Sequence, residues 1–146
     1  MQMSLCEVSV AHVPVMAALH ESAFEKPWNE KEFKGLLSLS TTKGWMDEDS
    51  LLMISHVLDE IEILTILTHP SARGKGKAKA LLTHLIQYAK ENNVSQIFLE
   101  VNIENLPAIS LYETMGFQKT GVRKNYYKMK DGSFRDALLY RILTNI

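Results

Sequence analysis

The chain has 146 residues, of which 46% are hydrophobic and 23% charged, and its formal net charge is −1. This length and composition predict one globular domain over residues 1–146 that can bury a core. The near-zero charge excludes a global field for nucleic acid or an anionic membrane, and no apolar run is long enough to span a bilayer. The N-terminus lacks the pattern of a signal peptide, so a cytoplasmic location is expected.

Cysteine and histidine usage gives no sign of a metal site. The single cysteine, Cys6, excludes an internal disulfide and a multi-cysteine metal site. Because Cys6 lies in an alternating segment, residues 4–10, we expect a buried, inert thiol in a first strand. The five histidines have no metal-ligand spacing. We therefore predict no bound metal.

Hydrophobic periodicity and turn residues predict alternating strands and helices. In chain order these are a strand at 4–10, helices at 12–24 and 29–39, a polar turn-like segment at 41–50, strands at 51–58 and 61–68, a helix at 78–89, a strand at 96–101, a helix at 105–115, and strands at 117–129 and 134–143. Asn29 followed by Glu32 has the pattern of a reciprocal helix cap. Asp131–Gly132 is a hairpin signal between the last two strands. Together these elements predict a mixed α/β sheet with helices on its faces.

The loop between the strand at 61–68 and the helix at 78–89 is the strongest functional signal. It carries Arg73, Gly74 and Gly76 directly before the helix. Glycines let the backbone approach a ligand closely, and the first N–H groups of a helix have no partner within it. This combination predicts an anion site, for which a phosphate is the usual ligand.

The loop does not fit the common nucleotide motifs. A P-loop needs Lys and then Ser or Thr after its last glycine, whereas Lys77 and Ala78 follow Gly76. A dinucleotide-binding loop needs a third glycine, and Lys79 stands at that place. The loop is therefore either a site for another kind of phosphate carrier or a solvated basic turn.

Two polar residues in the second half are candidates for chemistry. Glu100 lies in an otherwise apolar strand, where it either ends the sheet and faces solvent or is placed for catalysis. Tyr112 lies on the following helix, where it is either a packing residue or a proton donor. Neither residue alone decides between these alternatives.

The pattern of these segments resembles the GNAT acetyltransferases. Arg-x-x-Gly-x-Ala, from Arg73 to Ala78, is similar to the pyrophosphate-binding signature of that family. The second half matches at Leu99-Glu100-Val101, Asn105, Ala108, Leu111-Tyr112-Glu113 and Gly116-Phe117. Residues 27–33, 62–66 and 123–127 are similar to the RimI-type ribosomal-protein-alanine N-acetyltransferases. The resemblance covers nearly the whole chain and implies a mixed, mostly antiparallel central sheet flanked by helices on both faces.

The resemblance implies acetyl-CoA as the cosubstrate. Backbone groups at 66–68 would meet its acetyl and pantetheine arm, and residues 74–79 would cradle the pyrophosphate, with Lys75 and Lys77 adding charge. Asn105 would hold the pantetheine side. The implied cofactor residues are Ile66, Leu67, Thr68, Arg73, Gly74, Lys75, Gly76, Lys77, Ala78, Lys79 and Asn105.

The resemblance also assigns the catalytic roles. Glu100 matches the family's general base and Tyr112 its general acid. These residue types suit the reaction, because an α-ammonium must lose a proton before it attacks a thioester, and a phenol can protonate the departing thiolate. Strand N–H groups beside the thioester carbonyl would stabilise the oxyanion. Transfer without a covalent enzyme intermediate is expected, with Glu100 acting directly or through one water.

The RimI resemblance implies a protein partner, the N-terminal alanine of small-subunit ribosomal protein eighteen. Trp28, Tyr126 and Tyr127 are candidates to line its groove, although Trp28 could instead anchor two helices. Adjacent residues on a strand face opposite sides, so only one of the two tyrosines is expected to line the groove. Arg135 stands where the RimI type usually has Glu, which reverses one charge near the acceptor side.

Three alternatives remain open from the sequence. The acceptor could be another amine, such as a polyamine, an antibiotic or a lysine side chain, and an acidic pocket would favour a polyamine. The chain could instead be a non-catalytic CoA-binding domain, against which the presence of both Glu100 and Tyr112 argues. A nucleic-acid module has little support, because the basic residues at 73–79 form one local patch that CoA phosphates explain equally well.

Overall fold

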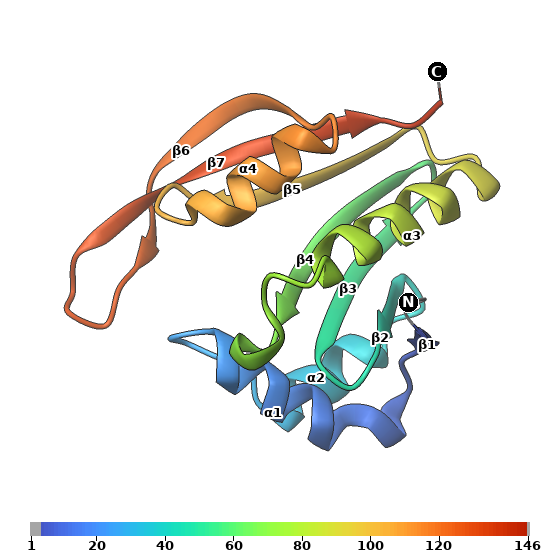
Figure 1. Ribbon diagram of the computed structural model, residues 1–146, viewed down its shortest axis with the longest axis horizontal. Helices are drawn as coiled ribbons and strands as arrows, with labels where there is room; N and C mark the ends of the chain where they lie inside the picture. Colours follow the sequence, from blue (N-terminus) through green and yellow to red (C-terminus); the bar gives the residue numbers. More distant parts are fainter. Residues whose placement is uncertain (1–3, 146) are drawn as a thin grey trace.

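The computed structural model describes residues 4–145, which form one seven-stranded sheet with helices on both faces (Figure 1). The elements are β1 (Cys6–Glu7), η1 (Val10–His12), α1 (Val13–Ala23), α2 (Glu30–Leu37), β2 (Thr42–Met46), β3 (Ser50–Val57), β4 (Glu60–Thr68), η2 (Pro70–Ala72), α3 (Lys77–Glu91), β5 (Gln96–Asn102), α4 (Leu106–Thr114), β6 (Gln118–Lys128) and β7 (Phe134–Leu143). None of the helices in this part of the chain is both long and apolar enough to cross a membrane.

The strand order is β1-β2-β3-β4-β5-β7-β6, and every neighbouring pair except β4 and β5 is antiparallel. The expected mixed, mostly antiparallel sheet is therefore confirmed. The parallel β4–β5 ladder pairs only Glu60–Glu62 with Gln96–Phe98. Beyond these residues the two strands diverge, as Figure 1 shows.

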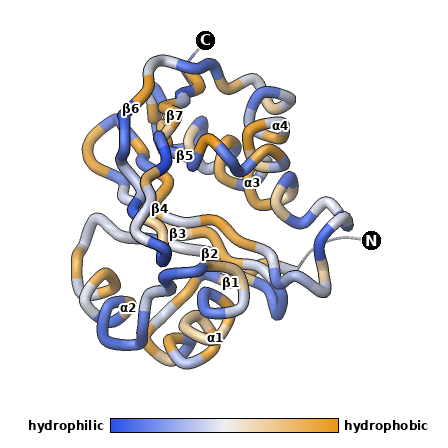
Figure 2. Tube along the Cα trace, turned by 90° about the vertical axis from the view of Figure 1, so that its left-hand side faces the viewer, coloured by the Kyte–Doolittle hydropathy of each residue, from blue (hydrophilic) through white to orange (hydrophobic). Residues whose placement is uncertain are grey.

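Two separate cores hold the helices on the sheet. In one, α1 and α2 bury Val13, Met16 and Phe33 against β3 and β4. In the other, the apolar stripe of α3 packs with α4 over β3, β4 and β5. Figure 2 shows the two helix pairs on opposite sides of the strands. Such two-sided covering explains why β3 and β4 are rich in buried aliphatic residues.

The helix cap and the hairpins follow the sequence pattern. Asn29 Oδ1 accepts the Glu32 N–H at 2.9 Å, and Glu32 Oε1 accepts the Asn29 N–H at 3.2 Å. This reciprocal cap is the one expected at the start of α2. Antiparallel hairpins join β3 to β4 and β6 to β7, also as expected.

Two local expectations are wrong. Residues 41–50 are not simply a turn, because Thr42–Met46 form β2. Gly44 allows this, since a Cβ there would collide with the Met53 side chain on β3. Cys6 is exposed rather than buried, because the first strand has only two residues and lies at the edge of the sheet.

Candidate functional site

A cavity of about 530 Å³ opens beside the end of β4, where the glycine loop leads into α3. Its walls come from α1, β4, the loop, α3 and α4. The lining residues are Ala23, Ile66, Leu67, Thr68, Ala72, Arg73, Gly74, Gly76, Lys77, Ala78, Lys79, Asn105, Pro107, Ala108, Leu111 and Tyr112. All but one of the expected cofactor residues are thus gathered here. We call this the cofactor cavity, after the role that the sequence predicts for these residues.

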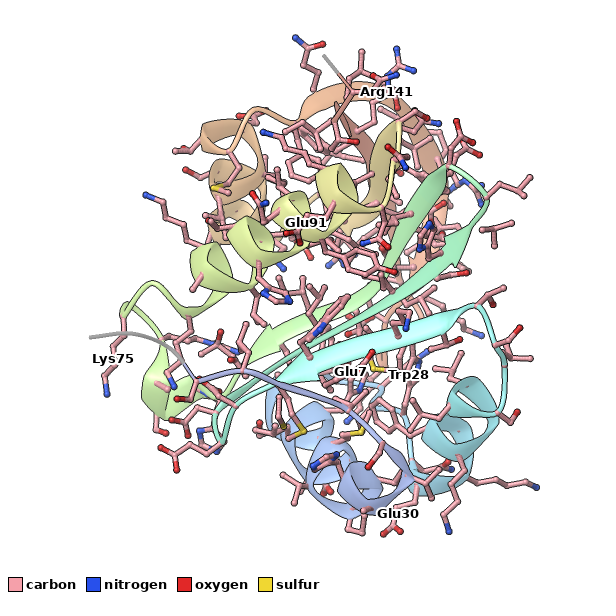
Figure 3. The ribbon with its side chains drawn as sticks, turned by 90° about the vertical axis from the view of Figure 1, so that its right-hand side faces the viewer. Glu7, Trp28, Glu30, Lys75, Glu91 and Arg141 are labelled. Atoms are coloured by element: carbon pink, nitrogen blue, oxygen red, sulfur yellow. The ribbon has the colours of Figure 1, made fainter. Side chains whose placement is uncertain are left out.

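The exception is Lys75, which does not line the cavity and extends away from the body of the molecule (Figure 3). The neighbouring glycines have left-handed backbone conformations, with φ of 80° at Gly74 and 76° at Gly76. Glycine adopts this conformation without the strain that a Cβ brings. Gly76 is the N-cap of α3, so the loop delivers unpaired helix N–H groups to the cavity.

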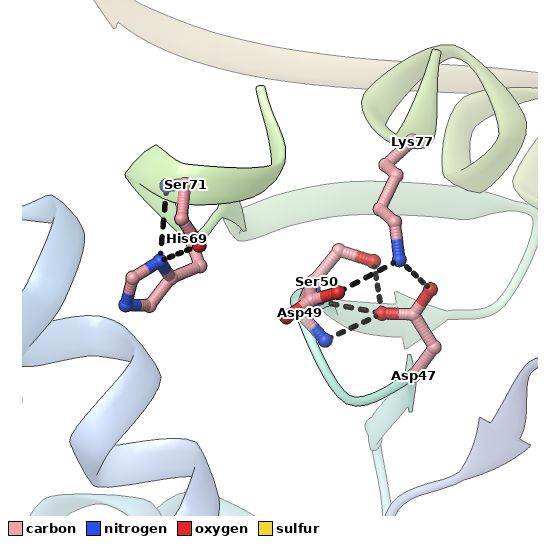
Figure 4. Close-up of polar contacts among 6 residues, drawn as sticks. All are labelled: Asp47, Asp49, Ser50, His69, Ser71 and Lys77. Carbon is pink, nitrogen blue, oxygen red and sulfur yellow. Dashed lines mark hydrogen bonds and ion pairs between the residues drawn. The ribbon is translucent and has the colours of Figure 1, made fainter. Parts of the chain in front are cut away.

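The start of α3 is tied to the turn between β2 and β3 (Figure 4). Lys77 Nζ lies 2.8 Å from Asp47 Oδ2 and 3.2 Å from Asp49 Oδ2. The Asp47 hydrogen bond raises the pKa of Lys77. Burial favours neutral Asp47, but hydrogen bonds from Lys77, Asp49 and Ser50 outweigh it and keep its pKa below the usual value. The Lys77 charge thus meets two carboxylates, whereas the sequence suggested that it adds charge to the pyrophosphate cradle.

The other end of the loop meets the same turn. The His69 N–H donates to the Asp49 carbonyl at 2.7 Å. His69 Nδ1 accepts the Ser71 N–H at 3.1 Å, which fixes the start of the short helix η2 (Figure 4). Both ends of the glycine loop are therefore braced by residues 47–50, and the glycines lie between these two points.

A second cavity, of about 510 Å³, lies where β4 and β5 diverge, on the other side of these strands from the cofactor cavity. Its lining residues are His20, Ala23, Phe24, Glu25, Lys26, Trp28, Ile63, Leu64, Thr65, Ile66, Leu99, Glu100, Val101, Asn102, Glu104, Asn105, Tyr112, Tyr127, Lys128 and Met129. The Lys130 N–H donates to Glu25 Oε1 at 3.0 Å and joins two of its walls. We call this the acceptor cavity, because Trp28 and Tyr127, which the sequence predicts to meet the acceptor, both line it.

Tyr112 lies where the two cavities meet, since both are lined by Ala23, Ile66, Asn105 and Tyr112. The residue is 5% exposed, and burial raises the pKa of its hydroxyl well above the ordinary value. The phenol therefore keeps its proton at neutral pH. Asn105 has a structural role beside it, because its Oδ1 accepts the Ala108 N–H at 3.3 Å and caps α4.

Glu100 lines the acceptor cavity and is largely buried, with 19% of its side chain exposed. Its Oε1 lies 3.2 Å from Arg123 Nε. A hydrogen bond with the Glu100 carboxylate raises the pKa of Tyr126, and burial together with Glu100 raises the pKa of Tyr127 to about 12. On the neighbouring strand, burial and Glu100 raise the pKa of Glu62.

The two adjacent tyrosines do not face opposite sides as a regular strand would require. Their ring centroids lie 5.0 Å apart, so the two rings contact each other. A break in the β6–β7 register between Arg123 and Tyr127 removes the alternation. Of the two, Tyr127 lines the acceptor cavity and Tyr126 does not.

His20 is a cavity residue that sequence reasoning did not assign to the site. It is 3% exposed and stacks on Trp28, with ring centroids 4.7 Å apart. Its Nδ1 accepts the Trp28 N–H at 2.9 Å, and Nε2 lies 3.2 Å from Thr65 Oγ1. Burial lowers its pKa to about 4, so the ring is neutral at pH 7. The only signal in the sequence was a histidine on the apolar face of a helix.

Trp28 both packs between two helices and lines a cavity wall. It packs edge-on against Phe33 of α2 at 5.5 Å and also lines the acceptor cavity. Arg135 stands where the RimI type usually has Glu. Its Nε lies 2.6 Å from Glu104 Oε1. Because Glu104 lines the cavity, Arg135 neutralises one of its carboxylates.

Comparison with known proteins decides the family. Residues 16–117 match the acetyltransferase (GNAT) family. The chain belongs to this family. It is 32% identical to the [ribosomal protein bS18]-alanine N-acetyltransferase of Escherichia coli K12, over 93% of this chain and 94% of that protein. It is 29% identical to a putative enzyme of the same name from Bacillus subtilis, over 87% and 86%.

Solved structures give the same GNAT fold. A crystal structure of the ribosomal-protein-S18-alanine N-acetyltransferase from E. coli matches with a TM-score of 0.91 and 27% identity, over 98% of this chain and 94% of that one. Arabidopsis thaliana NAA60 in complex with acetyl-CoA matches with a TM-score of 0.84 and 19% identity, over 98% and 100%. GNAT enzymes take an acetyl group from acetyl-CoA, and this chain is an acetyltransferase of that kind.

Proposed function

We propose that this GNAT enzyme acetylates the N-terminal α-amine of a protein, specifically the N-terminal alanine of ribosomal protein bS18. The observation that carries the proposal is the meeting of two cavities at Tyr112, with Glu100 in the second. The named activity of the E. coli relative, which aligns with 93% of this chain, supplies the acceptor.

The cofactor cavity would hold acetyl-CoA. Helix N–H groups after Gly76 and the backbone of Gly74 would bind the pyrophosphate, since unpaired N–H groups at a helix start favour an anion. Arg73 and Lys79 line the same cavity and would add positive charge. Ile66, Leu67 and Thr68 would pair with the pantetheine arm, as β4 has no β5 partner there among the described residues.

Glu100 would take the proton from the acceptor's α-ammonium, directly or through one water. Its place in the acceptor cavity, beside the β4–β5 divergence, supports this role. Tyr112 keeps its proton because burial raises its pKa, so it would act as the acid that protonates the departing thiolate. Its position in the walls of both cavities is what this step requires.

The charges of the acceptor cavity favour a peptide over a polyamine. Three carboxylates line it, those of Glu25, Glu100 and Glu104, and two of them are ion-paired with arginines. Lys26 and Lys128 line it as well. A polycation would therefore find little net negative charge, whereas a peptide N-terminus carries a single positive charge to be bound.

Mass spectrometry with two peptides tests the proposal. The first carries the free N-terminal sequence of bS18, and the second is the same peptide with a blocked N-terminus and an internal lysine. We expect acetylation of the first peptide alone. Modification of the second would point to a side-chain acceptor, and spermidine as a third substrate would reveal a polyamine enzyme.

A further inference from the structure

Strand β6 contains an enlarged bulge opposite a single residue of β7. Arg123 pairs with Ala137 and Tyr127 pairs with Arg135, so residues 124–126 on β6 face only Asp136 on β7. The central bulge residue, Asn125, has a left-handed backbone with φ of 53°. Asn tolerates this conformation better than most residues, but it still needs support from its surroundings.

Asp136 provides that support. Its Oδ1 accepts the Asn125 N–H at 2.9 Å, and its Oδ2 lies 3.5 Å from Lys124 Nζ. The Asn125 hydrogen bond keeps the pKa of Asp136 below its usual value. The Asp136 carbonyl also accepts the Ile103 N–H at 3.0 Å, which fixes Asp136 to the segment just after β5. One side chain thus satisfies the backbone donor that the bulge removes from the ladder.

The bulge determines which side chains meet Glu100. In a regular strand, Tyr126 would point away from the face shared by Arg123 and Tyr127. With the bulge, the Arg123 guanidinium lies 5.2 Å from the Tyr126 ring centroid and its Nε contacts Glu100 at 3.2 Å. The Tyr126 ring also packs on Tyr127, with ring centroids 5.0 Å apart, and Tyr127 lines the same cavity wall as Glu100.

We propose that Asp136 is a positioning residue for the general base, which holds the 124–126 bulge so that Arg123, packed over the Tyr126 ring, orients the Glu100 carboxylate. This inference rests on the proposed function, in which Glu100 accepts the proton of the amine. Asp136 has no place in the lining of either cavity, so its effect passes through the bulge. A carboxylate held by a fixed guanidinium keeps one orientation, and proton transfer depends on that orientation.

Matched variants separate this role from simple stabilisation of the hairpin. Asp136→Ala removes the acceptor of the Asn125 N–H, and we expect kcat to fall at least about tenfold while the KM for acetyl-CoA stays within about twofold. Asp136→Asn keeps an oxygen for that N–H and should restore most of kcat. Lys124→Met removes only the 3.5 Å ion pair of an 82% exposed side chain and should change neither constant.

A double-mutant cycle supplies the decisive measurement. If Asp136 acts through Glu100, then Asp136→Ala should lower kcat in the wild type but not in the Glu100→Gln background. An equal loss in both backgrounds would overturn the inference, as would full activity of Asp136→Ala. Should that variant not fold, Asp136→Ser, which shortens the reach to Asn125, serves in the same cycle.

The outcomes also distinguish this inference from the proposed function. The cycle uses whichever amine the wild-type enzyme acetylates. If that amine is not the bS18 N-terminus, the proposed function fails, but the inference about Asp136 can still be tested. If Glu100→Gln alone leaves turnover unchanged, the base assignment fails and the inference falls with it. If Glu100→Gln is slow while Asp136→Ala is fully active, only the inference falls.

Discussion

The cofactor cavity and the acceptor cavity share Tyr112 but are built in different ways. The first takes most of its wall from one short segment, residues 66–79, in which glycines expose the backbone. The second is lined by side chains from α1, the loop after it, β4, β5, α4 and β6. A ligand common to a family can be bound by a local backbone motif, whereas an acceptor is selected by residues that only the fold brings together.

The variant Glu100→Gln tests most directly whether the two cavities work independently. Loss of a general base typically costs about 100-fold or more in turnover. We expect that loss in kcat, with the dissociation constant for acetyl-CoA within about twofold of wild type by calorimetry. A parallel loss of acetyl-CoA affinity would mean that the two cavities are not independent.

The reciprocal change is Gly76→Glu. A left-handed backbone and a carboxylate at the helix start should weaken acetyl-CoA binding by about 100-fold or more, since the conformation alone costs about 1–2 kcal/mol and the charge repels phosphate. Nothing lies within 4 Å of a Cβ at this position, so no clash with the protein contributes. Gly76→Ala carries the strain without the charge and should lose about tenfold. Intact binding by Gly76→Glu would contradict the assignment of the loop.

Acidic pH should lower the stability of the fold through His20, which lines the acceptor cavity. Folding lowers the pKa of His20 from 6.5 to about 4, so between these values the unfolded chain binds the proton more readily and stability falls as the pH falls. Between pH 7 and pH 5 this residue should cost about 2 kcal/mol, seen as a lower urea midpoint. His20→Gln should show a smaller loss over the same interval. An identical pH dependence in both proteins would exclude His20 as the cause.

The smallest effect is expected from Asp47→Asn, which weakens the brace at the start of α3. Acetyl-CoA affinity should fall by about three- to fivefold, since Asp49 still holds Lys77 and one ion pair of this kind contributes about 1 kcal/mol. Lys43→Gln removes the exposed pair with Glu7 and should have no effect. Tighter binding by Asp47→Asn would instead show that the two carboxylates withhold Lys77 from the phosphates.

The same division explains what the sequence could predict. The glycine loop, the α2 cap and the strand β4 each depend on residues close together in the chain, and pattern reasoning found all three. Local patterns could not show that the two cavities meet at Tyr112, because β4, β5 and α4 come together only in the folded chain. Predicting a shared site for these residues required the resemblance to a family.

The errors have long-range causes. The strand at Thr42–Met46 depends on Gly44 fitting against Met53, and the polar composition of the segment concealed it. The bulge in β6 depends on a carboxylate eleven residues away from Asn125, so the alternation of Tyr126 and Tyr127 could not be trusted. The ion pairs of Lys77 were also beyond the reach of local patterns, since its partners lie 28 and 30 residues earlier.

The short β4–β5 ladder also bears on how the chain avoids aggregation. After Glu62, one side of β4 has no strand partner from β5. An unpaired strand edge of this kind normally promotes pairing with a strand of another chain. Here the edge lies in the interior of the sheet, between α1 on one face and α3 and α4 on the other. A second chain in extended form would have to enter between these helices to reach it. The enzyme can therefore leave backbone groups open to a narrow ligand while keeping them closed to other copies of itself.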